Sequence, residues 1–134
     1  MAELPDSVRA ALEDTNFWHL ATVNPDGSPQ STPVWVNVRD SKILVNTALG
    51  RKKPRNIEND PRIALSWHGT TPEGGYRNIA IQGKVVETIT GDQAEKDIDD
   101  LAQKYIGQSP YPWRSPGEQR VTYVIEPVHV HVMG

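Results

Sequence analysis

The sequence predicts a mainly β protein, a small antiparallel β-barrel with helices packed against its outside. Strand-like stretches follow one another closely near the N-terminus, and the turn residues Asp26 and Gly27 join the first two. The longest helical pattern comes late, so strands and helices do not alternate as they do in a parallel doubly wound sheet. A small barrel has little room inside, so we expect a large ligand on its outer face or at a subunit boundary.

Length and composition indicate one domain over residues 1–134. The chain has no Cys, which excludes disulfides, a thiolate nucleophile and a Cys-based metal site. Its net charge of -3 argues against general nucleic-acid binding, which usually requires a basic stripe. No apolar run approaches the ~18 residues of a membrane span. The N-terminus also lacks the pattern of a signal peptide, so a cytoplasmic location is expected.

The first part of the chain is expected to form one helix and three strands. Apolar spacing over residues 5–14 predicts a short helix. Residues 17–23 and 30–38 predict a hairpin, and residues 42–47 predict the next strand. Pro33 indicates an irregular start or a sheet edge in the second strand, because proline cannot donate a ladder hydrogen bond.

A basic helix is expected to follow and to end before Pro61, because the residue before a proline avoids helical angles. Residues 63–67 and 76–87 predict two further strands, separated by a loop at residues 68–75. Gly83, inside the second of these strands, indicates a β-bulge or a close backbone approach.

The clearest helical pattern runs from Thr90 to Gly107, where Thr90 and Gln93 have the spacing of a capping box. Three carboxylates of this helix are interpreted as a solvent-facing acidic side, namely Asp97, Asp99 and Asp100. The loop that follows bears Tyr111, Trp113 and Arg114, which either contact a ligand or cap the core. The last strand is expected from Arg120 to Val132, with an interruption at Pro127.

Four cations stand within five residues at the start of the basic helix: Arg51, Lys52, Lys53 and Arg55. Cations at a helix N-terminus oppose the positive end of its dipole, at about 0.3–1 kcal/mol each. An acidic chain has no general reason to build such a cluster. We interpret the cluster as an anion site, in which cations and exposed backbone N–H groups hold a ligand together. The alternative is a solvated basic turn.

A second informative stretch, Gln30 to Trp35, joins short polar groups to an aromatic ring. Such groups can hydrogen-bond the edge of a planar heterocycle. Together with the basic cluster, the stretch describes both ends of a flavin-like molecule. The ring system would lie at the second strand and the phosphate at the basic helix.

Other chemistries find little support in the sequence. His129 and His131 share one face of the last strand, but zinc requires three or four ligands, so no metal site is predicted. A serine nucleophile elbow is absent, and so are the glycine-rich phosphate and dinucleotide loops. The sequence therefore identifies no catalytic residue.

These motifs resemble the pyridoxamine 5′-phosphate oxidase-like split β-barrel family, and more closely its branch that uses the deazaflavin coenzyme F420. The resemblance covers nearly the whole chain, through residues 20–30, 31–35, 50–62 and the strand around Gly83. The basic segment 50–62, with its Asp-Pro-Arg ending, is the most specific part.

The resemblance implies an FMN-binding split-barrel type of fold, and a homodimer with two cofactor sites at the subunit interface. It places Thr32 to Trp35 beside the ring system, Asn46 and Thr47 of the third predicted strand along the ribityl-like chain, and the basic helix around the phosphate. It also suggests contacts from Asn78, and from Trp113 of the other subunit. The full cofactor-binding set is Gln30, Thr32, Pro33, Val34, Trp35, Asn46, Thr47, Arg51, Lys52, Lys53, Asn56, Asn78 and Trp113.

The resemblance further implies an oxidoreductase that transfers hydride between coenzyme F420 and a conjugated, electron-poor small molecule. FMN is the alternative cofactor, and a non-catalytic F420 carrier is the alternative role. Four clustered cations suit the more anionic deazaflavin, which carries a phosphodiester and a glutamate tail. True pyridoxamine phosphate oxidases carry additional basic motifs near their C-terminus. Residues 129–134 lack them, which argues against vitamin B6 oxidation.

Overall fold

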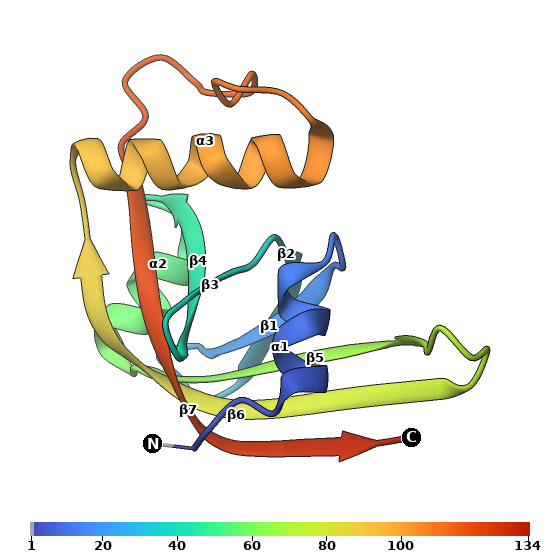
Figure 1. Cartoon of the computed structure of the whole chain (residues 1–134). Coiled ribbons are helices and arrows are strands. Elements are labelled where there is room, and N and C mark those ends of the chain that lie inside the picture. The colour runs from blue at the N-terminus through green and yellow to red at the C-terminus, as the bar shows by residue number, and fades with distance from the viewer. Residues whose placement is uncertain (1) are drawn as a thin grey trace.

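The protein folds around one curled antiparallel sheet, seen in a computed structural model that describes residues 2–134 (Figure 1). The strands are β1 Trp18–Val23, β2 Pro29–Val34, β3 Asn37–Arg39, β4 Lys42–Ala48, β5 Arg62–Thr70, β6 Tyr76–Ile89 and β7 Arg120–Met133. The helices are α1 Asp6–Glu13, α2 Lys52–Asn59 and α3 Asp92–Ile106. Among these residues, no helix is both long and apolar enough to cross a membrane.

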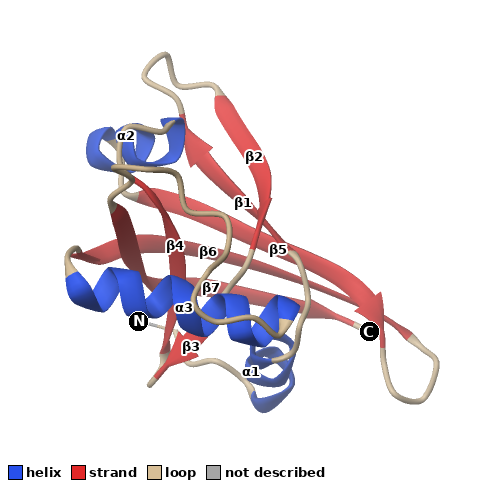
Figure 2. Ribbon diagram, turned by 90° about the horizontal axis from the view of Figure 1, so that it is seen from above, coloured by secondary structure: helices blue, strands red, loops and turns tan. Residues whose placement is uncertain are grey.

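The strand order is β2-β1-β5-β6-β7-β4-β3, and every neighbouring pair is antiparallel (Figure 2). β2 and β3 stand at opposite ends of this order, yet only Trp35 and Val36 separate them in the chain. Two residues bridge about 10 Å at most, so the sheet has to curl until its two ends meet. This confirms the predicted mainly β fold of the split-barrel type.

The inner face of the curled sheet supplies most of the core. Its fully buried side chains include Trp18, Leu20, Val45, Leu65, Ile79, Ile81, Tyr123 and Ile125. The helices close the remaining sides, as α1 packs on β3, α2 on β1 and β4, and α3 on β4 and β7. Because α2 and α3 both contact β4, the start of the basic helix lies near the long late helix.

The second strand is shorter than predicted, because the chain leaves the sheet at Trp35 and Val36. The backbone N–H of Val36 donates to Tyr105 Oη at 3.1 Å, and Lys104 Nζ donates to the Val36 carbonyl at 2.8 Å. Polar groups of α3 thus replace the ladder partners that a continuous strand would need. The 30–38 strand prediction is wrong at this point.

The predicted capping box at Thr90 and Gln93 is also wrong. α3 begins after Gly91, whose φ is 74°, and no side chain caps the helix there. The predicted end of the helix at Gly107 is confirmed, since Gly107 is its C-cap and adopts a left-handed conformation with φ 67°.

The irregularity predicted at Gly83 is confirmed. The β6–β7 register shifts between Gln82 and Gly83, and Pro127 lies opposite Gly83. The interruption predicted at Pro127 is wrong, since β7 runs through it without a break. The proline falls where the ladder is already irregular, so its missing N–H interrupts little.

Replacing Gly83 by alanine is expected to destabilise the fold by about 1–3 kcal/mol, because the added methyl group would overlap neighbouring atoms. An added Cβ would lie 2.8 Å from the Glu126 carbonyl oxygen and 2.9 Å from Ile125 Cγ2. Urea unfolding measures the loss. Gly75→Ala is the matched control, since its nearest neighbour is the flexible Thr71 Oγ1 at 3.2 Å. Equal losses in the two variants would contradict a close approach at Gly83.

Candidate functional site

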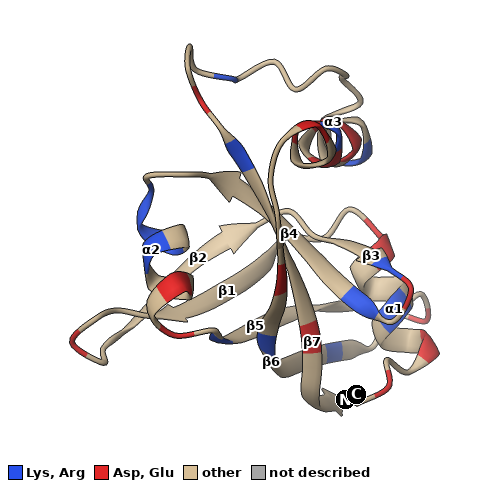
Figure 3. Cartoon of the chain, turned by 90° about the vertical axis from the view of Figure 1, so that its left-hand side faces the viewer, with Lys and Arg blue, Asp and Glu red and all other residues tan. Residues whose placement is uncertain are grey.

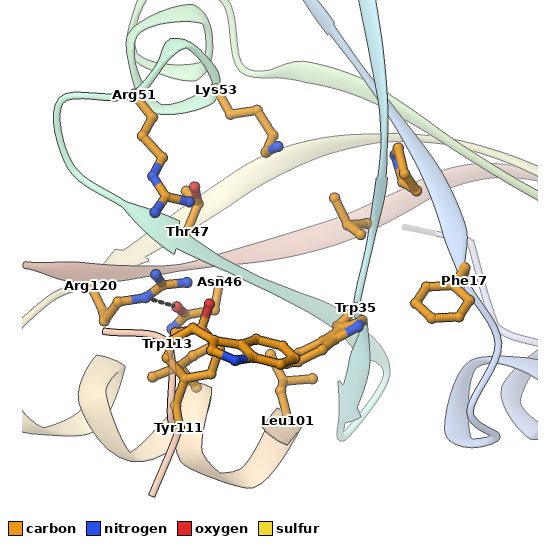
Figure 4. Close-up of a pocket in the computed structure, with 13 residues that line it drawn as sticks. Phe17, Trp35, Asn46, Thr47, Arg51, Lys53, Leu101, Tyr111, Trp113 and Arg120 are labelled. Atoms are coloured by element: carbon orange, nitrogen blue, oxygen red, sulfur yellow. Dashed lines mark hydrogen bonds between the residues drawn. The ribbon is translucent and has the colours of Figure 1, made fainter. Parts of the chain in front are cut away.

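A cavity of about 250 Å³ opens where β4, the start of α2, α3 and the loop after α3 come together (Figure 4). Eight of the thirteen residues predicted from the sequence line it: Pro33, Val34, Trp35, Asn46, Thr47, Arg51, Lys53 and Trp113. The other lining residues are Phe17, Ile98, Leu101, Tyr111 and Arg120. The structure therefore joins the two sequence segments, basic and aromatic, in a single cavity.

One end of the cavity is cationic. Arg51 and Lys53 enter it from the start of α2, and Arg120 enters from the start of β7 (Figure 4). Figure 3 shows the basic residues gathered on α2. Lys53 Nζ donates to Thr32 Oγ1 at 3.0 Å. Burial, and then the charge of Arg51, lowers the pKa of Lys53. An anion between these groups would oppose the lowering of this pKa, because its charge favours the protonated amine.

Two polar groups at this end have unused hydrogen-bonding capacity. Thr47 Oγ1 is buried and has no hydrogen-bond partner among residues 2–134. Arg120 Nη1 is in the same condition, although it lies 3.3 Å from Glu118 Oε1 as an ion pair. Buried polar atoms normally find partners, so these atoms fit a ligand that brings acceptors.

The other end of the cavity is aromatic. The Trp35 ring stacks on Tyr105, with centroids 5.3 Å apart and planes 9° apart. Tyr111 meets Trp35 edge-on at 6.2 Å, and Trp113 lies 6.3 Å from Trp35. Trp113 is 60% exposed and Phe17 is 59% exposed. Large exposed aromatic side chains beside a cavity are typical of surfaces that another molecule covers.

Lys104 and Tyr105 hold the backbone that carries Trp35. Lys104 Nζ donates to the carbonyls of Leu12 and Val36, at 2.7 and 2.8 Å. Tyr105 Oη donates to the Asn16 carbonyl at 2.7 Å. Burial lowers the pKa of Lys104 to about 8, against the opposing effect of nearby carboxylates.

This pKa predicts a pH dependence of stability. Between about pH 8 and pH 10.5 the unfolded chain binds more protons at Lys104 than the folded chain, so stability rises with pH in that window. Below this window the cost of burying the charge is fully present. Thermal unfolding of the wild type and of Lys104→Met at about pH 7 and pH 9.5 tests this. The Tm of the wild type, relative to that of the variant, should be higher at about pH 9.5 than at about pH 7. Equal changes of Tm with pH in the two proteins would exclude Lys104 as the cause.

Arg120, for which the sequence predicts no role in a site, is 3% exposed and is held from two sides. Its Nε donates to Asn46 Oδ1 at 2.9 Å, and its guanidinium lies 5.2 Å from the centre of the Tyr111 ring. Asn46 Nδ2 donates in turn to Thr122 Oγ1 and to the Ala94 carbonyl, both at 2.9 Å. The Asn46 amide is thus occupied within the protein, and it orients Arg120 toward the cavity.

The acidic side predicted for α3 is wrong in part. Asp97 is 4% exposed and accepts hydrogen bonds from Thr122 Oγ1 and Arg39 Nη2, both at 2.8 Å. Asp97 therefore fixes Thr122, which bonds Asn46, which in turn bonds Arg120. Asp99 accepts the Tyr111 backbone N–H at 2.8 Å and so ties the aromatic loop to the helix. Asp100 is exposed.

Asn56, predicted near a phosphate, belongs to α2 and faces the β1–β2 hairpin, outside the cavity lining. It is buried, and its Nδ2 donates to Thr22 Oγ1 and Asn24 Oδ1, both at 3.0 Å. These bonds fasten α2 to the β1–β2 hairpin. In this chain Asn56 fixes the direction from which Arg51 and Lys53 reach the cavity.

Four further predicted residues lie outside the cavity lining. Thr32 is next to it, through its bond with Lys53. Gln30 accepts from Thr22 Oγ1 at 3.4 Å, and Lys52 is exposed to solvent. Asn78 lies on β6 and pairs with Met133 of β7. The cofactor contacts predicted for these residues stay predictions.

For several residues that line the cavity, the sequence pattern predicted another role or none. Ile98 and Leu101 belong to the apolar stripe of α3, a pattern that predicts core packing. Tyr111 belongs to the aromatic loop, for which a ligand contact and a core contact were both open. Phe17 and Arg120 belong to no recognisable sequence motif, since each is a single residue at the start of a strand.

The fold and the cavity together define a split-barrel protein whose cavity suits an aromatic ligand with an anionic group. The chain belongs to the pyridoxamine 5′-phosphate oxidase family, whose model matches residues 4–134. This confirms the family predicted from the sequence.

Individual relatives agree with this assignment. A pyridoxine/pyridoxamine 5′-phosphate oxidase from Rubrobacter xylanophilus is 33% identical over 84 residues, which cover 62% of this chain and 37% of that protein. The chain spans less than two fifths of the length of the curated relatives it matches.

Solved structures extend the comparison. An F420 reductase superposes with a TM-score of 0.78 at 29% identity, covering 95% of this chain and 98% of its own, which supports the F420-dependent branch. A heme binding protein from Mycobacterium smegmatis shares the fold, with a TM-score of 0.68 at 18% identity over 97% of this chain and 55% of that one.

Proposed function

We propose that this protein is an F420-dependent oxidoreductase, which transfers hydride between the deazaflavin and a conjugated, electron-poor small molecule. The observation that carries the proposal is the cavity, in which a stacked tryptophan and three cations lie at opposite ends. The similarity to an F420 reductase over almost the full length of both chains supports it.

The lining residues fit both parts of such a cofactor. Arg51, Lys53 and the buried Thr47 hydroxyl would hold the phosphate. Trp35 and the adjacent Pro33 would lie along the ring system. The bound coenzyme supplies the hydride chemistry, while the protein binds it, orients it and excludes water. Reaction at the ring needs no side-chain nucleophile, in agreement with the absence of nucleophile motifs from the sequence.

A second copy of the chain is part of this proposal. Ligand pockets usually measure about 300–1,000 Å³, and the cavity of about 250 Å³ falls below that range. Trp113 and Phe17 leave its rim exposed. Asn78 lies away from the cavity of its own chain, so its predicted contact would come from another subunit. A homodimer would enlarge and cover the site.

FMN is the second candidate cofactor, because the family model and the curated relatives are those of pyridoxamine 5′-phosphate oxidases. FMN carries one phosphate, whereas F420 carries a phosphodiester and a glutamate tail. Three cations at one end of the cavity favour the ligand with more negative charge.

The experiment is a titration of the purified protein with F420 and, separately, with FMN, followed by fluorescence anisotropy. Reduced F420 is then mixed with a panel of activated alkenes and quinones, and pyridoxamine 5′-phosphate is tested separately with oxidised FMN. We expect tighter binding of F420 and turnover of at least one conjugated acceptor. Tight binding without turnover would favour a carrier, and preference for FMN would overturn the cofactor assignment.

A further inference from the structure

Glu118 places a carboxylate between two of the cavity's arginines. Its side chain is 5% exposed, at the end of the loop that follows α3. Glu118 Oε1 accepts from Arg51 Nη2 at 2.9 Å and lies 3.3 Å from Arg120 Nη1. Both guanidiniums belong to the cavity lining. The carboxylate therefore engages the groups that would hold a ligand anion.

This arrangement is incompletely bonded. Glu118 Oε2 is buried and finds no hydrogen-bond partner in the described part of the chain, and neither does Arg120 Nη1. A buried carboxylate oxygen without donors loses its hydration, and no protein hydrogen bond compensates for that loss. A phosphate offers more acceptor oxygens to two guanidiniums and forms paired, charge-assisted bonds with them. An exchange of one anion for the other is thus chemically reasonable.

We propose that Glu118 is a built-in competitor, a carboxylate that an incoming phosphate group displaces from Arg51 and Arg120. This rests on the proposed function only in requiring an anionic ligand in the cavity. Part of the ligand's binding free energy goes into breaking the Glu118 contacts, which lowers the affinity of every displacing anion by the same factor, so that strongly charged ligands still bind and weakly charged ligands do not. Glu118 thereby sets a threshold of charge for occupancy of the site.

The loop can release Glu118 without losing its aromatic residues. Arg114 pairs with Glu95 and with Asp99, both at 3.0 Å, and the Tyr111 N–H bonds to Asp99. These contacts hold the loop to α3 upstream of Glu118. Displacement then involves only residues 115–119, and Tyr111 and Trp113 keep their places beside Trp35.

Inorganic pyrophosphate is the probe, and calorimetric titration is the measurement. Glu118→Gln keeps the shape of the side chain and removes its charge, so it should bind pyrophosphate about tenfold more tightly than the wild type. Glu118→Ala removes the contact altogether and should also bind more tightly. The control is Glu13→Gln, which changes the net charge equally at an exposed ion pair of α1 and should bind as the wild type does. Thermal unfolding without ligand checks that each variant is folded.

Unchanged or weaker binding in both Glu118 variants would overturn the inference, and would make Glu118 a residue that positions the two arginines. Absence of pyrophosphate binding in every variant would overturn it as well. An equal gain in Glu13→Gln would assign the effect to net charge and reject the inference. The outcome is separable from the proposed function, because tighter pyrophosphate binding can occur in a protein that fails to bind F420.

Discussion

Joint replacement of Arg51 and Lys53 by alanine is expected to weaken F420 binding about 100-fold at low salt, equivalent to about 2.7 kcal/mol. Both side chains enter the cavity from the start of α2, on the side of the buried Thr47 hydroxyl. Each charge-assisted hydrogen bond to a phosphate contributes about 1.5–3 kcal/mol, so two lost bonds suffice for this effect. The remaining affinity should also depend less on ionic strength, since fewer charges attract the ligand.

Fluorescence anisotropy with F420 at low and high salt measures both effects. The matched control is Lys84→Ala with Lys96→Ala, which removes the same number of positive charges from exposed positions outside the basic cluster and outside the cavity lining. The control should retain nearly all of the affinity. If the control and the cavity variant lose affinity equally, a diffuse positive field attracts the ligand and the anion site lies elsewhere.

The fold could be predicted because its signals are local. Alternating apolar residues, the Asp26–Gly27 turn and the irregular Gly83 each act over a few neighbours. The end of β2 could not be predicted in the same way. Trp35 and Val36 have the pattern of a strand, but the side chains of Lys104 and Tyr105, almost 70 positions away in the chain, hydrogen-bond the Val36 backbone in place of a neighbouring strand. A competitor so distant in sequence leaves no trace in the local pattern.

The same contrast explains the site. The basic and aromatic segments each form a continuous motif, so most of their members were found and meet in the cavity. Arg120 stands alone in the sequence and Asp97 stands in an acidic group, and the roles of both arise from contacts across the sheet and α3. An Asp on an amphipathic helix suggests solvent until Thr122 and Arg39 are brought against it by the fold.

Trp35→Ala is expected to lower F420 affinity about 10- to 100-fold, because stacking of a base on an aromatic ring contributes about 1–3 kcal/mol. Trp35 offers a stacking surface that is already ordered. Its ring lies parallel to Tyr105, and the backbone of the next residue is bonded to both Tyr105 and Lys104. Little side-chain freedom is left to lose when a ligand binds, so most of the stacking energy should appear as affinity. Trp35→Phe should recover the larger part of it.

Two variants separate stacking from scaffold damage. Tyr105→Phe keeps the ring beneath Trp35 but removes the hydroxyl that bonds Val36 and Asn16. It should lower the Tm while leaving F420 affinity within a few-fold of the wild type. Trp35→Ala should show the reverse, a loss of affinity larger than its loss of stability implies. If Tyr105→Phe loses affinity as strongly as Trp35→Ala, the backbone at Val36 matters more to binding than the Trp35 ring, and the cofactor ring lies on another wall of the cavity.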